Sequence, residues 1–141
     1  MTAAAFLLPV RVYWEDTDAG GVVFYANYLK YFERARTEWL RSAGVGQQAL
    51  AESEGAVFVV SDVQLRYAAP ARLDDSLTVS VQPQHVGRAQ IQVRQQCRRG
   101  EVLLCEGTIR IACVDRGTFR PRRIPTDILA RLAPSVDHLL P

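Results

Sequence analysis

The chain of 141 residues is poor in the side chains that build metal centres and disulfide frameworks. It contains three cysteines and two histidines, and no two cysteines have the C-x-x-C spacing. An odd cysteine count without that spacing supports neither a zinc site nor a set of disulfides. We therefore expect no metal, and interpret Cys97, Cys105 and Cys113 as small buried side chains of a protein from a reducing, cytoplasmic compartment.

Lysine and long apolar runs are also scarce, and the charge is nearly balanced. Lys30 is the only lysine, and 17 basic residues face 15 acidic ones, a net charge of +2. A duplex-binding protein usually has a stronger basic excess, so we expect no nucleic-acid partner. No apolar run is long enough for an integral membrane segment, and the N-terminal residues lack the basic start of a signal peptide. The length predicts a single domain over residues 1–141.

Hydrophobic periodicity predicts one long helix followed by several strands. Between residues 25 and 43 apolar side chains recur every three or four positions, which indicates a helix with one wide apolar face. That face comprises Tyr25, Tyr28, Leu29, Phe32, Ala35, Trp39, Leu40 and Ala43. Alternating patterns predict strands over residues 6–15, 57–67, 76–85, 89–98 and 102–114, and short helices over 47–54 and 126–132. The sum is an α+β fold, a curved antiparallel sheet wrapped around one central helix.

The segment Glu15–Tyr25, EDTDAGGVVFY, carries the strongest chemical signal. Three carboxylates crowd between a strand and a helix, and like charges at short range raise one another's pKa and cost free energy. The helix start that follows has unpaired N–H groups and partial positive charge, which suit a developing anion. A carboxylate base beside such an anion hole is sufficient to hydrolyse an acyl bond. The alternative is that these acids only form turns and caps, as Asp commonly does before Gly.

The run RVYWEDTDAGGVVFYANY at residues 11–28, continued by FERARTE at 32–38, resembles the hotdog-fold acyl-CoA thioesterases. It is most similar to their Tol–Pal-associated subgroup and more distantly to the 4-hydroxybenzoyl-CoA thioesterases. The stretches AVFVV at 56–60 and YAAPARLDD at 67–75 resemble the same subgroup. The resemblance implies a hotdog fold that hydrolyses thioesters of CoA, or of an acyl carrier protein, without a metal or other cofactor. It also implies homodimers with paired sheets, often tetramers, and active sites at the dimer interface.

The resemblance places the catalytic carboxylate on Asp18 and the oxyanion donor on the backbone N–H of Tyr25. Asp18 would either take a proton from water or attack the thioester carbonyl, and the sequence leaves both routes open. Many members of the subgroup carry histidine where this chain has Tyr25, so any role of that imidazole is absent here. Hydroxybenzoyl-type relatives have an aromatic residue there, which keeps activity as the expectation while the acyl preference can differ.

Five further residues are expected to contact the substrate: Gly20, Gly21, Val22, Asn27 and Arg88. The two glycines either let the loop approach the substrate closely or only form a tight turn. Asn27 either caps the helix or binds Asp18. Arg88 follows Gly87 in a predicted turn, and by analogy with family members that hold the nucleotide on such loops it is the candidate for the CoA phosphates. Solvated arginines are the alternative for Arg88 and for the other candidates, Arg66, Arg72, Arg120, Arg122 and Arg123.

The remaining ionisable residues are weaker candidates for a catalytic role. Glu33 on the long helix is a second candidate carboxylate, with a solvated salt bridge as the alternative. Asp16 is expected to be a turn or capping residue and Glu15 a surface charge. His85 and His138 lack the sequence context of a nucleophilic triad and are interpreted as structural.

Two other functions stay open beside hydrolysis. One is a non-hydrolytic acyl- or CoA-binding hotdog module that acts as a partner protein. The other is a binder of single-stranded nucleic acid, which is disfavoured because the aromatic residues fit a helix face better than an exposed stacking platform.

Overall fold

The computed structural model describes residues 5–135, so His138 lies outside the described part of the chain. The strands are β1 (Phe6–Arg11), β2 (Ala56–Tyr67), β3 (Ser76–Val86), β4 (Gln90–Arg99) and β5 (Val102–Asp115). The α-helices are α1 (Asn27–Ser42), α2 (Gln47–Glu54) and α3 (Thr126–Leu132). Two short 3₁₀ turns complete the elements, η1 (Trp14–Asp16) and η2 (Ala133–Ser135).

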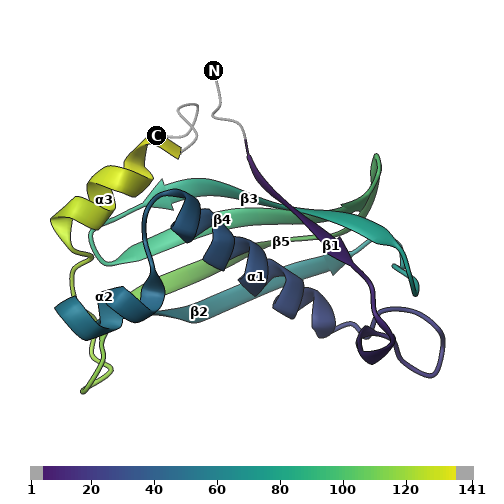
Figure 1. The fold of residues 1–141 in the computed structure, drawn as a ribbon, viewed down its shortest axis with the longest axis horizontal. Helices are drawn as coiled ribbons and strands as arrows, with labels where there is room; N and C mark the ends of the chain where they lie inside the picture. The colour runs from purple at the N-terminus through teal and green to yellow at the C-terminus, as the bar shows by residue number, and fades with distance from the viewer. Residues whose placement is uncertain (1–4, 136–141) are drawn as a thin grey trace.

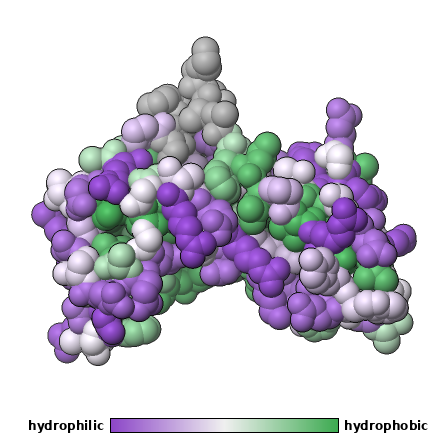
Figure 2. All heavy atoms as spheres, viewed as in Figure 1, coloured by the Kyte–Doolittle hydropathy of each residue, from purple (hydrophilic) through white to green (hydrophobic). Residues whose placement is uncertain are grey.

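The strands form one five-stranded sheet in the order β1-β3-β4-β5-β2, and every neighbouring pair is antiparallel. Helix α1 lies across one face of this sheet, with α2 and α3 at one end and the segment between β1 and α1 at the other (Figure 1). Hydrophilic side chains run along the outer side of α1, and apolar ones show beside them (Figure 2). The expected α+β architecture, a sheet wrapped around a central helix, is confirmed.

The core forms because α1 and the strands each bury one apolar face. Along β3 the side chains of Leu77, Val79 and Val81 are buried and alternate with polar, partly exposed ones. This two-residue period is that of a half-buried strand. On α1 the buried set recurs at helical spacing and packs against that surface. It consists of Tyr28, Tyr31, Phe32, Ala35, Trp39 and Leu40.

The predicted apolar face of the long helix was partly wrong at its start. Tyr25 is 65% exposed and Leu29 is 38% exposed, whereas Tyr31, which was left out of the predicted face, is fully buried. The reason is that α1 begins only at Asn27, so Tyr25 precedes the helix and does not follow its periodicity. The apolar surface at this end of α1 is therefore left open to solvent within one chain.

The first strand is shorter than predicted, and the boundaries of the other strands and of α2 and α3 agree to within about one residue. Strand β1 ends at Arg11 because residues 14–16 turn into η1, whose Asp16 carboxylate accepts the backbone N–H of Tyr13 at 2.8 Å. The three cysteines are buried and free, as predicted. Burial raises the pKa of Cys97 and of Cys105 to about 12, so both thiols stay protonated near neutral pH. Among the described residues, no helix is both long and apolar enough to span a bilayer.

Gly107 allows β5 and β2 to approach closely, which gives a test of the sheet. A Cβ atom at this position would overlap the carbonyl oxygen of Gln64 and a methyl group of Leu65. We expect Gly107→Ala to lower the free energy of unfolding by about 1–3 kcal/mol through overpacking, measured by urea denaturation. Gly117→Ala is the control, because its Cβ would meet only an Asp115 carboxylate oxygen at 3.4 Å. Equal stability of the two variants would contradict this close packing.

Candidate active site

The acidic segment folds into a small hairpin over residues 17–23, hereafter the 17–23 hairpin. Thr17 and Val23 form an antiparallel bridge, and the N–H of Asp18 donates to the carbonyl of Val22 at 2.9 Å. The N–H of Gly21 donates back to the Asp18 carbonyl at 3.0 Å, and Gly21 has a φ of 79°, a conformation that favours glycine. The tight-turn interpretation of the glycine pair is therefore supported, and Asp18 stands at the tip of the hairpin.

Asp16 anchors this hairpin to the start of α1. Its backbone carbonyl accepts two hydrogen bonds, from the N–H of Phe24 at 2.9 Å and from the Nδ2 amide of Asn27 at 2.8 Å. The Asp16 residue is 6% exposed, and its carboxylate accepts the Tyr13 N–H. The predicted turn or capping role of Asp16 is confirmed. Both alternatives expected for Asn27, a helix cap and a bond to Asp18, were wrong. Its side-chain amide donates instead to the Asp16 carbonyl.

The second strand of the 17–23 hairpin is held by the segment that follows β2. Val23 donates its N–H to the carbonyl of Ala71 at 2.8 Å, and Val22 forms a bridge with Arg72. The hydroxyl of Tyr28, on the first turn of α1, accepts the N–H of Ala71 at 3.1 Å. Residues 67–75, the stretch that resembled the thioesterases, thus hold the 17–23 hairpin through backbone hydrogen bonds.

Asp18 and the Tyr25 amide both have capacity for a ligand. Asp18 is exposed, and its Oδ1 accepts the N–H of Gly20 at 2.8 Å, which leaves Oδ2 without a partner among residues 5–135. The N–H of Tyr25 likewise finds no acceptor in this part of the chain, whereas its carbonyl accepts the hydroxyl of Tyr67 at 2.9 Å. An unpaired N–H just before a helix is the group expected for an anion hole. Asp18 therefore stands open to solvent in the part of a single chain that the structure describes.

Tyr31 lies beneath this region and had no distinguishing signal in the sequence. Its hydroxyl is buried without a hydrogen-bond partner among the described residues. Burial, followed by the neighbouring Asp16 carboxylate, raises the pKa of Tyr31 above that of a free phenol. The phenol therefore stays protonated and neutral behind the anchor of the hairpin.

Arg88 is remote from Asp18 within one chain. Ser76 begins β3 opposite Arg11, near the 17–23 hairpin, and Arg88 follows the far end of the same strand. The ten residue-to-residue steps along β3 span about 33 Å, so Arg88 could serve a site at Asp18 only across the dimer interface at which the active sites are expected. The carbonyl of Arg88 accepts the N–H of Ile124 at 2.7 Å, and its exposed side chain is at the α3 end. His85 is also exposed at that end of β3.

Two of the other arginine candidates have structural partners. Arg66 donates to the Glu106 carboxylate at 2.7 Å, and this hydrogen bond is the main cause that lowers the pKa of Glu106. Arg122 donates to the backbone carbonyl of Glu54 at 2.6 Å, where it neutralises the C-terminal end of α2.

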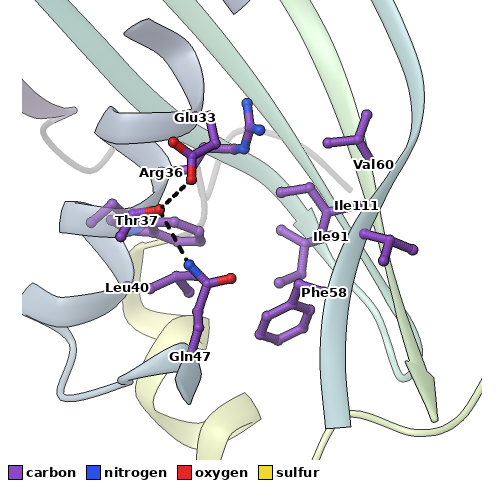
Figure 3. Close-up of a pocket in the computed structure, with 11 residues that line it drawn as sticks. Glu33, Arg36, Thr37, Leu40, Gln47, Phe58, Val60, Ile91 and Ile111 are labelled. Carbon is purple, nitrogen blue, oxygen red and sulfur yellow. Dashed lines mark hydrogen bonds between the residues drawn. The ribbon is translucent and has the colours of Figure 1, made fainter. Parts of the chain in front are cut away.

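A cavity lies between α1, α2 and the inner face of β2 and is hereafter called the α1–β2 cavity (Figure 3). Its volume is about 140 Å³. Glu33 lies at this cavity, where its carboxylate accepts the hydroxyl of Thr37 at 3.1 Å. The predicted salt bridge of Glu33 does not form with any described residue. No local pattern predicts this cavity, because its lining comes from elements far apart in the chain.

The sheet around α1, together with the 17–23 hairpin at the start of that helix, defines the protein as a hotdog-fold enzyme of the thioesterase type. Residues 12–132 match the model of the thioesterase-like superfamily, and the chain belongs to that family. It is 45% identical over 125 residues to the acyl-CoA thioesterase YbgC of Haemophilus influenzae, covering 89% of this chain and 92% of that protein. The acyl-CoA thioester hydrolase YbgC of Escherichia coli is 43% identical over 131 residues, with coverages of 92% and 97%.

A solved structure supports the same assignment. The probable thioesterase of Bartonella henselae superposes with a TM-score of 0.82 at 35% identity, covering 86% of this chain and all of that one. The predicted resemblance to the hotdog thioesterases, and to their Tol–Pal-associated YbgC subgroup, is thereby confirmed.

The anchor of the hairpin can be tested without reference to activity. In Asn27→Ala the Asp16 carbonyl keeps only the Phe24 N–H as donor, so the hairpin should open more often. We expect amide hydrogen exchange of Phe24 and Asp18 to accelerate about tenfold, as loss of roughly one net hydrogen bond implies. Gln48→Ala, which removes an exposed bond to Glu52 on α2, is the control. Unchanged exchange at both amides would show that Asn27 does not hold the hairpin.

Proposed function

We propose that the protein hydrolyses acyl-CoA thioesters, with Asp18 as base or nucleophile and the Tyr25 N–H as oxyanion donor. One observation carries the proposal: a partly unpaired carboxylate in the 17–23 hairpin and an unpaired amide just before α1 are joined through the Asp16 carbonyl, which accepts hydrogen bonds from Phe24 and Asn27. That arrangement, in a chain of the thioesterase-like family, supplies both groups that thioester hydrolysis needs.

The chemistry requires no further group. The thioester oxygen accepts the Tyr25 N–H and becomes an oxyanion, a contact that typically contributes about 2.7–4 kcal/mol to lowering the barrier. In one route a water oxygen bonds to the carbonyl carbon while Asp18 takes its proton, and the C–S bond then breaks. In the other, an Asp18 carboxylate oxygen bonds to that carbon, the C–S bond breaks to leave an anhydride, and water then cleaves the anhydride. In both routes the thiolate leaves and takes up a proton. A thioester on an acyl carrier protein has the same pantetheine arm and would react in the same way.

The site is completed by a second copy of the chain. Strand β1 is a short edge that contains Pro9, whereas the other edge, β2, is twelve residues long and exposes Val60, Val63 and Tyr67. A long, partly apolar edge without proline is a template for strand pairing. Antiparallel pairing of two β2 edges about a two-fold axis is the self-complementary solution.

This pairing would cover the exposed catalytic groups. Because the Tyr67 end of β2 carries the Tyr25 carbonyl and the 17–23 hairpin, the antiparallel partner would bring its own hairpin beside the Phe58 end of this chain. The α1–β2 cavity lies at the Phe58 end, and Arg88, which follows β3, is at the same end of the sheet. We therefore assign the CoA phosphates of each site to Arg88 of the chain opposite its Asp18. The dimer is the unit that the proposed mechanism requires.

The role of Asp18 is tested by Asp18→Asn. The amide cannot accept a proton from water or attack the thioester, so kcat for acyl-CoA hydrolysis should fall at least about 100-fold while the dimer persists. Thiol release from a panel of acyl-CoA esters, followed with a thiol-reactive dye, measures this loss.

Asp74→Asn serves as the matched control. Asp74 is an exposed aspartate with a φ of 69°, which asparagine tolerates equally well. Near-native turnover of Asp18→Asn on every ester would refute the assignment. CoA binding by the wild-type protein without any thiol release would instead favour the non-hydrolytic binding module.

The proposed dimer edge is tested by Val63→Asp. A carboxylate in the centre of the paired edges would face its own copy across the two-fold axis, so we expect a monomer by light scattering after size-exclusion chromatography. Leu7→Asp on the other edge strand is the control, because Leu7 is 58% exposed on β1 and should not change the mass. A dimer that survives Val63→Asp but dissociates in Leu7→Asp would place the interface on β1.

A further inference from the structure

Arg36 is a half-buried cation that borders the α1–β2 cavity. It lies on α1, and its guanidinium extends into the gap between α1 and β2 (Figure 3). Its Nη1 donates to the Oε1 of Gln95 at 3.0 Å, and this is its only hydrogen bond with the described residues. None of the ion pairs in the described part of the chain includes Arg36.

The surrounding residues fix Arg36 in this position. Gln95 is completely buried, and its Nε2 donates to the carbonyls of Phe32 and Ser80 at 3.1 and 3.2 Å. Its amide oxygen is therefore locked towards the guanidinium. Burial lowers the pKa of Arg36, and the negative charge of Glu33 partly opposes that effect.

Most of the guanidinium is available to a ligand. It has five N–H donors, and the Gln95 amide oxygen accepts only one of them. The other nitrogens of Arg36 are accessible to solvent, since the Tyr31 hydroxyl is the only buried side-chain N or O atom without a partner among the described residues. They border a cavity, so a ligand that carries an acceptor would form a charge-assisted hydrogen bond with them there.

The rest of the α1–β2 cavity is largely apolar. Its lining on the sheet side consists of Phe58, Val59, Val60, Ile91 and Ile111. A cavity of about 150 Å³ accommodates a molecule the size of benzene, and this one has a volume of 140 Å³. It would hold an acyl group of roughly four to six carbons and would exclude a long alkyl chain.

We propose that the α1–β2 cavity is the acyl-group site and that Arg36 selects short acyl groups whose far end carries a hydrogen-bond acceptor, an oxo or a carboxylate oxygen. This inference rests on the proposed function. Arg36 acts on specificity, since it would touch the distal end of the substrate and none of the reacting atoms.

The position of Arg36 requires that the thioester come from the partner's 17–23 hairpin. Eleven residues of chain separate Tyr25 from Arg36, which corresponds to about 16 Å along a helix. A short acyl group cannot bridge that distance within one chain. The antiparallel pairing of β2 edges places the partner's hairpin near the Phe58 end instead, beside the cavity. Glu33 at the same cavity would repel a carboxylate but not an oxo group, so the two acceptors should differ in rate.

The test compares esters of matched length. Wild-type protein is assayed with pentanoyl-CoA, 4-oxopentanoyl-CoA and glutaryl-CoA, and with dodecanoyl-CoA as a size probe. We expect kcat/KM for at least one acceptor-bearing ester to exceed that for pentanoyl-CoA tenfold to a hundredfold, the effect of a hydrogen bond to a charged group. Dodecanoyl-CoA should be the poorest substrate. The ester with the higher kcat/KM, 4-oxopentanoyl-CoA or glutaryl-CoA, shows whether Arg36 binds an oxo or a carboxylate oxygen.

Arg36→Met removes the charge and keeps the length of the side chain. It should abolish the preference for acceptor-bearing esters, so that within this variant their kcat/KM no longer exceeds that for pentanoyl-CoA. Arg34→Met, which removes an exposed arginine on the same helix, is the control and should keep the preference. Arg36→Lys should restore part of it, which a purely structural role would not.

The inference fails if wild-type protein shows no preference among the short esters, or if Arg36→Met slows all of them equally. Its failure is distinguishable from failure of the proposed function. If no ester releases thiol, binding of 4-oxopentanoyl-CoA and pentanoyl-CoA is compared by calorimetry in wild type and Arg36→Met. Equal affinity of the wild-type protein for both ligands would then overturn the role of Arg36, and tighter binding of the oxo ester that is lost in Arg36→Met would sustain it.

Discussion

The carbonyl oxygen of Asp16 is the acceptor on which the rest of the site depends. It receives the Phe24 amide and the Asn27 side chain together, and so joins the 17–23 hairpin to the first turn of α1. This junction sets where Asp18 stands relative to the unpaired Tyr25 N–H. The anchor is itself enclosed, with the Asp16 carboxylate tied to Tyr13 and the neutral Tyr31 phenol behind it. Preorganised donors and carboxylates of this kind stabilise developing charge without reorganisation during the reaction.

The same geometry leaves the site unfinished in a single chain. Asp18 is exposed, Tyr25 precedes its helix, and apolar surface continues from there to the edge of β2. The α1–β2 cavity lies at the opposite end of that strand from the hairpin. A two-fold pairing of β2 edges would resolve both problems together, because it would place each hairpin beside the other chain's cavity. The proposed active site is thus a property of the sheet edge as much as of the catalytic loop.

Local patterns predicted most of the fold. Alternation in the strands and periodicity in the helices located α2, α3 and four of the five strands to within about one residue. The motif at residues 11–28 predicted the family, and its glycine pair predicted a tight turn after Asp18. What the sequence could not supply were long-range pairings: the bond of Asn27 to Asp16, the distance of Arg88, and the contact of Arg36 with Gln95. Those depend on strand order and on buried polar groups, which have no periodic signature.

The most direct test of the account is turnover per chain as the wild-type protein is diluted through its dimer dissociation. Thiol release from a short acyl-CoA ester is measured together with the solution mass at each concentration. If two chains complete each site, turnover per chain falls in proportion to the dimer fraction and returns on reconcentration. Constant turnover per chain in a solution of monomers would contradict a site shared across the β2 edges, and the absence of thiol release from the intact dimer would contradict hydrolysis itself.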